Sequence, residues 1–600
     1  MARIEDYAVI GDTQTVALVS RRGSIDWLCF PRFDSPACFA KLLGDVDNGA
    51  WSVAPVDGWE CTSRRYVDDS LVLETRWDLE GGSVTVTDYM PPRGKAPDVV
   101  RIVEGVSGRV DMSSVLRLRF GYGEVVPWVR RVKGQLVGIA GPDAVYLRSD
   151  VRHYGEDYAS VARFSVEAGQ RVAFVLTWHP SHEPPPKPVD PERSLRNTYD
   201  YWEEWSGRCG VTGEYADAVK RSLLTLKALT YSPTGGLVAA ATTSLPEALG
   251  GVRNWDYRFC WLRDATLTLE ALMHSGFTEE ASEWAEWLLR AVAGDPEDLQ
   301  IMYGLAGERR LTENELDWLP GYEGSAPVRI GNAAAQQFQL DVYGEVMAAL
   351  ALARRMDIPG SMDSWPVQLA LLGHLEKVWK NPDEGLWEVR GPRQHFTHSK
   401  VMCWVAFDRA AAAVERFGLR GDARRWRAIA DEIRREVCEK AYDEERGAFT
   451  QAFGSKALDA AVLMMPRVGF LRGDDPRFVS TVHRIREELA EDGFVRRYET
   501  AEPGSDGSDE NVDGLPGREG AFLACSFWLA DAEHYIGEHD RARHRFERLL
   551  DLRNDVGLLA EEYDPVTGRQ LGNFPQAFSH LGLTNTAYLL TGRPTLSRRR

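Results

Sequence analysis

Two glutamates, Glu388 and Glu561, are candidates for chemistry because each lies beside an aromatic side chain in a polar segment. Glu388 occurs in GLWEVRG and follows Trp387, whereas Glu561 occurs in LLAEEYD, close to Tyr563. Hydrolysis of a glycosidic bond uses two carboxyl groups, one protonated to help the leaving oxygen and one ionised to activate water. We predict that Glu388 is the acid, because an apolar neighbour raises a carboxyl pKa, and that Glu561, in a more polar loop, is the base.

A third segment, RNWDYRFCWLRD from Arg253 to Asp264, combines the side chains that bind sugars. The flat faces of Trp and Tyr stack on sugar rings, while Asp and Arg side chains form directed hydrogen bonds to hydroxyls. The predicted sugar contacts in this segment are Trp255, Asp256, Tyr257, Trp261, Arg263 and Asp264. Trp255 and Trp261 have an alternative interpretation as core residues, since buried aromatics usually pack in the core.

The overall composition excludes several classes of partner. The chain has 600 residues, of which 44% are hydrophobic and 27% charged, and a formal net charge of −19. Such a charge repels phosphates, so we expect a neutral small-molecule substrate and no nucleic acid. The start MARIEDYAVIGD has no export signal, and no apolar run approaches the ~18 residues of a membrane helix. We therefore expect a cytoplasmic protein without a membrane partner.

The sequence predicts no metal and no cofactor. Its eight cysteines are scattered without a C-x-x-C pair, which argues against a disulfide framework or a zinc ribbon. His395 and His398 have H-x-x-H spacing but no third ligand nearby, so we expect them to flank Thr397 as a helix cap. The acidic stretch SDGSDENVDG from Ser505 lacks the spacing of a calcium loop and is expected to be a solvated surface loop.

The elements that position these residues fall into two domains and a linker. Residues 1–180 alternate with period two around glycine turns, as in LVLETRWDLEGGSVTVTDYM, which predicts an antiparallel β-sandwich. The proline-rich segment HPSHEPPPKPVDP predicts a semi-rigid linker over 181–211. From residue 212 to 600 the apolar period becomes helical, which predicts a helical catalytic domain.

Roughly twelve helices are predicted in the second domain. They span 212–231, 264–274, 278–293, 332–356, 365–380, 397–417, 422–442, 457–465, 476–490, 518–536, 538–551 and 575–591. Short connections alternate with long ones, and short connections join antiparallel neighbours, so the six long ones should emerge at one end of a double ring of helices. Every chemically distinctive cluster falls in one of those long connections, which predicts that they meet around a common funnel.

From about Gly251 to Thr591 the chain resembles glycoside hydrolase family 15, the family of glucoamylases and trehalases. The resemblance rests on D-Y-x-x-x-W-x-R-D at 256–264, L-W-E ending at Glu388, R-Y at 497–498 and A-E-x-Y-D around Glu561, in the family's order. The preceding sandwich resembles the N-terminal domain of the prokaryotic members. Together these similarities cover nearly the whole chain.

The resemblance implies an (α/α)6 barrel and inversion at the anomeric carbon, with no metal. By position, Glu388 matches the family's general acid, Glu561 its general base, and Tyr257 a tyrosine that helps to position the water. Arg263, Asp264 and Arg497 match contacts to the terminal glucose. The remaining predicted sugar contacts are Arg329, Trp387 and Tyr563.

The expected function is release of glucose from a small α-glucoside, and α,α-trehalose is the preferred substrate because no export signal is present. Hydrolysis of α-1,4 or α-1,6 gluco-oligosaccharides is the alternative within the family. A disaccharide phosphorylase, in which phosphate replaces the activated water, and a non-catalytic sugar-binding protein are alternatives of other classes. An inverting enzyme requires carboxyl groups roughly 6.5 to 9.5 Å apart. The sequence leaves the oligomeric state, the pH optimum and the second sugar subsite open.

Overall fold

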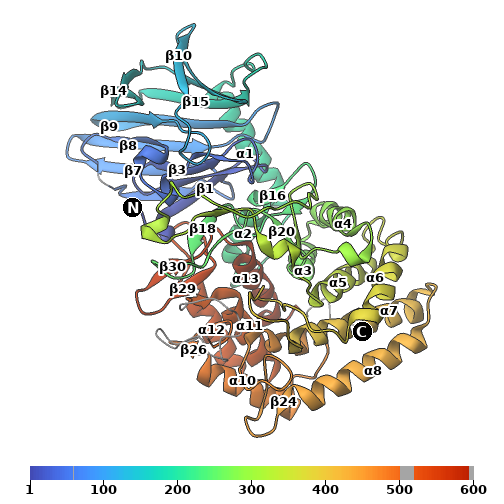
Figure 1. Ribbon diagram of the computed structural model, residues 1–600. Coiled ribbons are helices and arrows are strands. Elements are labelled where there is room, and N and C mark those ends of the chain that lie inside the picture. Colours follow the sequence, from blue (N-terminus) through green and yellow to red (C-terminus); the bar gives the residue numbers. More distant parts are fainter. Residues whose placement is uncertain (59, 500–518, 594–600) are drawn as a thin grey trace.

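The structure, a computed structural model, describes residues 1–58, 60–499 and 519–593 (Figure 1). An N-terminal β domain lies against one end of a larger helical domain. None of the helices in the described part of the chain is both long and apolar enough to cross a bilayer.

The β domain is an antiparallel sandwich whose two layers share one long strand. Strand β9 pairs with β8 and β15 through its first half and with β5 and β14 through its second half. The strands are β1 (Tyr7–Gly11), β2 (Val16–Ser20), β3 (Ser24–Cys29), β4 (Ala37–Phe39), β5 (Ala50–Pro55), β6 (Ser63–Tyr66), β7 (Leu73–Leu79), β8 (Gly82–Tyr89), β9 (Asp98–Arg117), β10 (Trp128–Val132), β11 (Gln135–Ala140), β12 (Asp143–Ser149), β13 (Tyr154–Glu156), β14 (Ala159–Glu167) and β15 (Arg171–Pro180). The predicted sandwich is confirmed.

The prediction of a linker over 181–211 is wrong for its second half, which forms helix α1 (Pro191–Gly207). Asp190 caps this helix by accepting a hydrogen bond from the Arg193 N–H, and a proline at the first helical position is compatible with a helix start. Leu195 packs against the β domain, whereas Trp205 stacks on Phe277 of the helical domain. The helix therefore joins the two domains rather than spacing them.

The helical domain contains a helix or helical turn at each of the twelve predicted places. The helices are α2 (Ala216–Ala228), α3 (Ala265–Ser275), α4 (Thr278–Val292), α5 (Asp341–Arg355), α6 (Trp365–Val378), α7 (Thr397–Phe417), α8 (Ala423–Lys440), α9 (Met465–Val468), α10 (Pro476–Glu488), α11 (Leu523–Tyr535), α12 (His539–Leu550) and α13 (Ala577–Leu590). Two of the predicted helices are longer than the helices in the structure. The helix predicted from 332 begins at Asp341, and the helix predicted at 457–465 is mainly a 3₁₀ turn, Ala460–Met464.

Two concentric rings of helices form the barrel. Helices α3, α5, α7, α11 and α13, with the short turn at 460–468, pack in a closed inner ring, because α13 also contacts α3. Helices α11 and α13 are apolar and buried nearly all round, as expected of inner elements. The outer helices, such as α8 and α12, bury one stripe at helical spacing. The arrangement is that of an (α/α)6 barrel.

The β domain also supports the connection between α2 and α3, which carries the predicted sugar contacts. The indole N–H of Trp27 donates to the Ala241 carbonyl over 2.9 Å. The guanidinium of Arg258 reaches into the β domain and donates to the Ser35 carbonyl over 3.1 Å. These hydrogen bonds hold the connection between α2 and α3 against the β domain.

Candidate active site

Four of the six long connections meet at one narrow slot of about 30 Å³, so the predicted convergence is met in part. The connections are those that follow α2, α4, α6 and α10. The lining residues are Glu247, Arg253, Trp255, Tyr257, Arg263, Asn332, Ala334, Trp387, Glu388, Val389, Arg390, Arg497, Tyr498 and Phe522.

Glu388 lies on the slot wall and is held by positive and hydrogen-bond-donating groups. Its Oε1 accepts hydrogen bonds from the Trp261 indole over 2.7 Å and from the Arg263 guanidinium over 3.3 Å. Burial raises the pKa of Glu388, while Arg263 and the indole hydrogen bond lower it. Its backbone has φ +59°, a conformation that non-glycine residues adopt only where surrounding structure imposes it.

The predicted reason for the raised pKa of Glu388 is only partly right. Trp387 lines the slot, but its indole N–H is directed to Asp459, at 2.9 and 3.1 Å from the two carboxylate oxygens. The general burial of Glu388, rather than this one apolar neighbour, is the largest cause of the shift.

Glu561 lies behind the slot wall, in surroundings that differ from the prediction. It is 1% exposed rather than in a polar loop. Burial, followed by repulsion from Glu247, raises the pKa of Glu561 to about 8. Its Oε2 accepts a hydrogen bond from the Asn573 N–H over 3.0 Å, and its Oε1 has no hydrogen-bond partner among the described residues. That oxygen is free to accept a proton.

The backbone around Glu561 requires a glycine. At Gly572, where φ is +72°, a Cβ atom would lie 2.5 Å from the Glu561 Oε2 atom. A side chain at this position would therefore be strained and would displace the carboxylate.

Tyr257 connects the two sides of the slot. It is buried, its hydroxyl is close enough to Glu561 for the two groups to interact electrostatically, and its ring packs edge-on against Trp261 with centroids 5.1 Å apart. Burial raises the pKa of Tyr257 well above its ordinary value, and both Glu561 and Glu388 add to this effect. The phenol is therefore a neutral donor and acceptor within the electrostatic reach of both carboxylates.

A cluster of three further glutamates, Glu247, Glu519 and Glu562, was missed by the sequence reasoning. One carboxylate oxygen from each lies within 4.8 Å of the others. Arg497 joins them, at 2.7 Å from Glu247 and 2.5 Å from Glu519, and Arg253 lies 3.6 Å from Glu519. These guanidinium groups supply positive charge to the cluster. Glu247 sits in SLPEALGG, which has no local feature that marks it.

The first segment divides into wall residues and residues that lie behind the wall. Trp255 lines the slot, between the guanidinium groups of Arg329 and Arg390, which lie 4.6 and 4.8 Å from its ring. Trp261 is buried behind the wall and acts on Glu388 through its hydrogen bond. Asp264 pairs with Arg263 over 3.0 Å, also behind the wall.

Two predicted sugar contacts are placed away from the slot wall. Asp256 is fully buried, and its carboxylate accepts hydrogen bonds from the Arg258 guanidinium and from the Gly331 N–H over 3.0 Å. Tyr563 lies on strand β29 (Glu562–Asp564) and packs edge-on against Phe494. Successive side chains of a strand point to opposite faces, so Glu562 on the inner face leaves Tyr563 on the outer one.

Among the described residues, neither His395 nor His398 belongs to a group of three or more side chains placed to hold a metal ion. Helix α7 begins at Thr397, with Phe396 rather than Thr397 at the N-cap, so the predicted cap is wrong. His398 is buried, and burial lowers its pKa to about 4, so that its ring is neutral. The acidic stretch that starts at Ser505 lies outside the described residues.

Comparison with known proteins places both parts of the chain. Residues 213–588 match the family model of glycosyl hydrolases family 15, and residues 1–181 match a trehalase-like N-terminal domain. The chain is 40% identical to a trehalase of Mycobacterium tuberculosis, over 97% of this chain and 88% of the relative. It is 34% identical to a trehalase of Thermoplasma volcanium, over 98% of this chain and 93% of the relative.

A solved structure shares the fold of the whole chain. A bacterial glucoamylase complexed with acarbose superposes with a TM-score of 0.73, covering 99% of this chain and 95% of its own, at 13% sequence identity. Such a low identity supports the common arrangement of sandwich and barrel only.

Proposed function

The chain belongs to glycosyl hydrolase family 15 and is a glycoside hydrolase, and we propose that its substrate is α,α-trehalose, which it cleaves to two molecules of glucose. The observation that carries this proposal is the similarity to proteins named trehalase, which extends over both domains rather than over the barrel alone. The alternative, a glucoamylase-type hydrolase of gluco-oligosaccharides, is supported less well, because that likeness is one of fold.

The proposed reaction is a single displacement with inversion. Glu388 donates its proton to the oxygen that bridges the two glucose units, and the bond from this oxygen to one anomeric carbon breaks. Glu561 accepts a proton from a water, whose oxygen forms a new bond to the same carbon from the opposite face. One glucose then leaves as the α anomer, and the attacked glucose is released as the β anomer.

Three further residues support this assignment of roles. Tyr257 lies on the slot wall within electrostatic reach of Glu561, which suits the positioning of the attacking water. Arg263 donates to Glu388 and is on the wall, where it can also reach a sugar hydroxyl. Arg497 lies on the wall too, but Glu247 and Glu519 already accept from its guanidinium, so fewer of its donors face a sugar.

The protonation states define the pH dependence that we propose. Glu561 acts only when ionised, and its pKa is raised to about 8, whereas Glu388 acts only when protonated and its ionised form is favoured by Arg263 and the Trp261 indole. The active form is therefore the minor one with the proton on Glu388, and its share falls below the pKa of Glu388 and above about pH 8. Because Glu247, Glu561 and Glu562 interact, the basic limb belongs to the group rather than to one residue.

The substrate is tested by supplying the purified protein with trehalose, maltose and isomaltose separately and measuring released glucose. We expect glucose from trehalose at the highest kcat/KM. No glucose from trehalose, with glucose from maltose or isomaltose, would contradict the proposed substrate. Appearance of glucose 1-phosphate in phosphate buffer, with activity retained in Glu561→Gln, would favour a phosphorylase. A cytoplasmic location stays a prediction that cell fractionation can check.

A further inference from the structure

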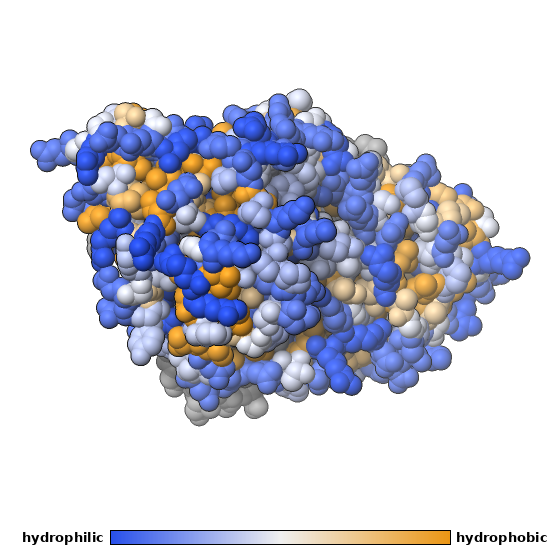
Figure 2. Space-filling view, turned by 90° about the horizontal axis from the view of Figure 1, so that it is seen from above, coloured by the Kyte–Doolittle hydropathy of each residue, from blue (hydrophilic) through white to orange (hydrophobic). Residues whose placement is uncertain are grey.

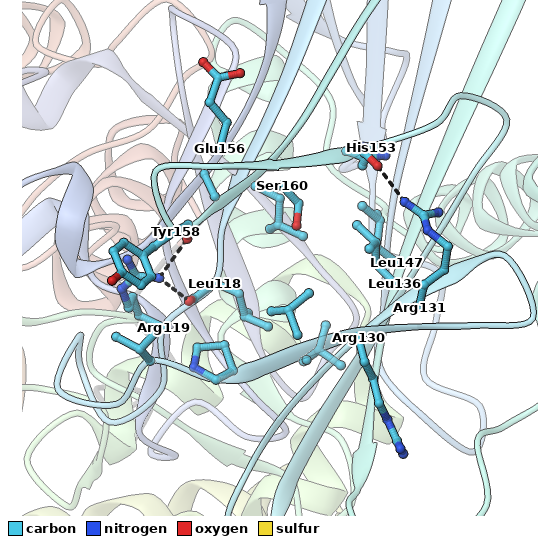
Figure 3. Close-up of a pocket in the computed structure, with 18 of the residues that line it drawn as sticks. Leu118, Arg119, Arg130, Arg131, Leu136, Leu147, His153, Glu156, Tyr158 and Ser160 are labelled. Carbon is cyan, nitrogen blue, oxygen red and sulfur yellow. Dashed lines mark hydrogen bonds between the residues drawn. The ribbon is translucent and has the colours of Figure 1, made fainter.

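A second cavity, of about 440 Å³, lies between the two layers of the β domain and shares no residue with the slot (Figure 3). Its volume is within the range of cavities that hold small molecules. Its walls are mainly aliphatic and include Leu116, Leu118, Leu136, Val145, Leu147 and Leu176. Such walls offer no hydrogen bonds to sugar hydroxyls, so the cavity does not suit a carbohydrate.

A buried arginine without a carboxylate partner lies at one end of this cavity. Arg119 is 5% exposed, and its guanidinium donates to the Leu118 carbonyl over 2.8 Å and to the Tyr158 carbonyl over 3.4 Å. Within the described ranges, no carboxylate lies within 4.0 Å of it. Arg117, by contrast, pairs with Asp47 over 3.0 Å.

A buried charge normally has a counter-ion, because its removal from water is costly. Burial and the neighbouring Arg117 lower the pKa of Arg119, and Asp47, the ion-pair partner of Arg117, raises it by a smaller amount. Glu156 and Asp157 also line the cavity, but Glu156 pairs with Arg163 over 3.0 Å and its carboxylate points away from the cavity in Figure 3. Among the described residues, no ion pair within 4.0 Å joins Asp157 to Arg119. An anion bound at this end would supply the missing charge.

The mouth of the cavity carries exposed apolar side chains. Val126, Val129 and Tyr158, which line the cavity, are 54%, 44% and 84% exposed, and Trp128, their neighbour on β10, is 66% exposed. Viewed from this end of the molecule, hydrophobic surface gathers over the β domain, on the left of Figure 2. Exposed apolar patches beside a cavity are typical of binding sites for partly apolar ligands.

We propose that this cavity binds an amphipathic anion, namely a straight-chain fatty acid, with its carboxylate on Arg119 and its chain along the leucine wall. The guanidinium provides a charge-assisted partner for the carboxylate, and Leu118, Leu136 and Leu147 lie between Arg119 and the opposite end at His153 (Figure 3). Burial lowers the pKa of His153 to about 4, so its ring is neutral, and the exposed Arg131 at that end donates to the His153 and Gly134 carbonyls over 2.6 and 2.9 Å.

The test is calorimetric titration of the full-length protein with saturated carboxylates of increasing chain length, each below its micelle concentration. Burial of one methylene is worth about 0.8 kcal/mol, so Kd should fall about fourfold per added methylene until the cavity is full. Decanol, which lacks the charge, should bind at least about tenfold more weakly than decanoate. A wild-type protein that binds no decanoate at millimolar concentration would overturn the proposal.

Two variants separate the roles of the charge and of the cavity. Arg119→Met keeps the length of the side chain and should weaken decanoate at least about tenfold while leaving decanol unchanged. The matched control is Arg109→Met, on strand β9, which ends just before Arg119; Arg109 is 64% exposed and outside the cavity, so the change should leave both ligands unchanged. Ser160→Phe, which fills the cavity from β14, should abolish binding of both. Thermal unfolding and trehalose hydrolysis confirm that each variant is folded.

Two outcomes would contradict the proposal. Decanoate binding that survives both Arg119→Met and Ser160→Phe would place the ligand elsewhere. Co-sedimentation with phosphatidylglycerol vesicles, in a protein that does not bind free decanoate, would mean that the exposed side chains contact a membrane surface instead.

Discussion

The two sides of the active-site slot hold their carboxylates in opposite electrostatic surroundings. Glu388 receives hydrogen bonds from an indole and a guanidinium, which favour its ionised form. Glu561 accepts a single backbone hydrogen bond, from Asn573, and lies near Glu247. Burial and repulsion from Glu247 outweigh that hydrogen bond and favour the protonated form of Glu561. The free structure therefore favours a proton on Glu561, although Glu561 is the proposed base.

This difference shows that the residue next to a glutamate in the sequence does not determine whether its carboxyl group is protonated. Trp387 is adjacent to Glu388 in sequence, yet the groups that act on Glu388 come from another connection. In the sequence, the neighbouring Glu561 and Glu562 indicate a polar loop, yet both side chains are buried in the structure. The comparison also implies that only part of the enzyme is in the active protonation state at neutral pH.

The largest expected effect comes from removing either carboxylate. Glu388→Gln and Glu561→Gln should each lower kcat for trehalose at least about 100-fold, the usual contribution of a positioned proton donor or acceptor. Steady-state kinetics measure this, with the exposed Glu444→Gln as control. Activity within tenfold of the wild type in either variant would remove that residue from the proposed mechanism.

The second prediction changes the Glu561 side alone. Glu247→Gln removes a negative charge that raises the pKa of Glu561 and keeps an oxygen that can accept from Arg497. Because Glu561 has the higher of the two pKa values, the basic limb of the kcat/KM profile should move to lower pH, and the rate between the two limbs should rise as more of the enzyme is in the active form. A basic limb that does not move would mean that Glu247 carries no charge when the enzyme is active.

The third prediction changes the Glu388 side. Trp261→Phe removes a hydrogen bond that stabilises ionised Glu388, so the pKa of Glu388 should rise. Since Glu388 has the lower of the two pKa values, the acid limb of the profile should move to higher pH, with a loss in kcat of less than about tenfold. A change in the basic limb instead would mean that Trp261 acts on the group that contains Glu561.

The smallest effect is on stability and concerns pH. The pKa of Glu561 is raised in the folded protein, so its contribution to stability is fully present at acidic pH and is lost as the pH rises through about 8. Glu561→Gln cannot ionise, so its unfolding temperature should exceed that of the wild type by a margin that grows between pH 5 and pH 9. The exposed Glu167→Gln should show no such trend.

Much of the fold could be predicted from the sequence because the periodicities are strong. Apolar residues repeat at helical spacing through α7 and α8, and Gly418 stops α7 in a left-handed conformation at the predicted place. Helix α1 was missed because the prolines before it dominate the local composition, although Asp190 and Pro191 mark a helix start. The turn at 460–464 is too short for its period to distinguish it from a longer helix.

The candidate site was predictable where chemistry is local and not where it arises from tertiary contacts. Trp255, Tyr257, Glu388 and Arg497 were predicted, and the structure brings them to or beside the same slot. Glu247 and its partners come from separate connections and carry no flanking motif, so the cluster exists only once the chain is folded. The roles of these residues remain predictions.

The most direct test of the two-carboxylate mechanism is the anomeric composition of the first glucose formed from trehalose, followed by proton NMR before mutarotation. Inversion by a water held between Glu388 and Glu561 predicts equal amounts of α-glucose and β-glucose in the earliest spectra. Early product consisting of α-glucose alone would mean retention, and would contradict an acid and a base that face each other across the bound sugar.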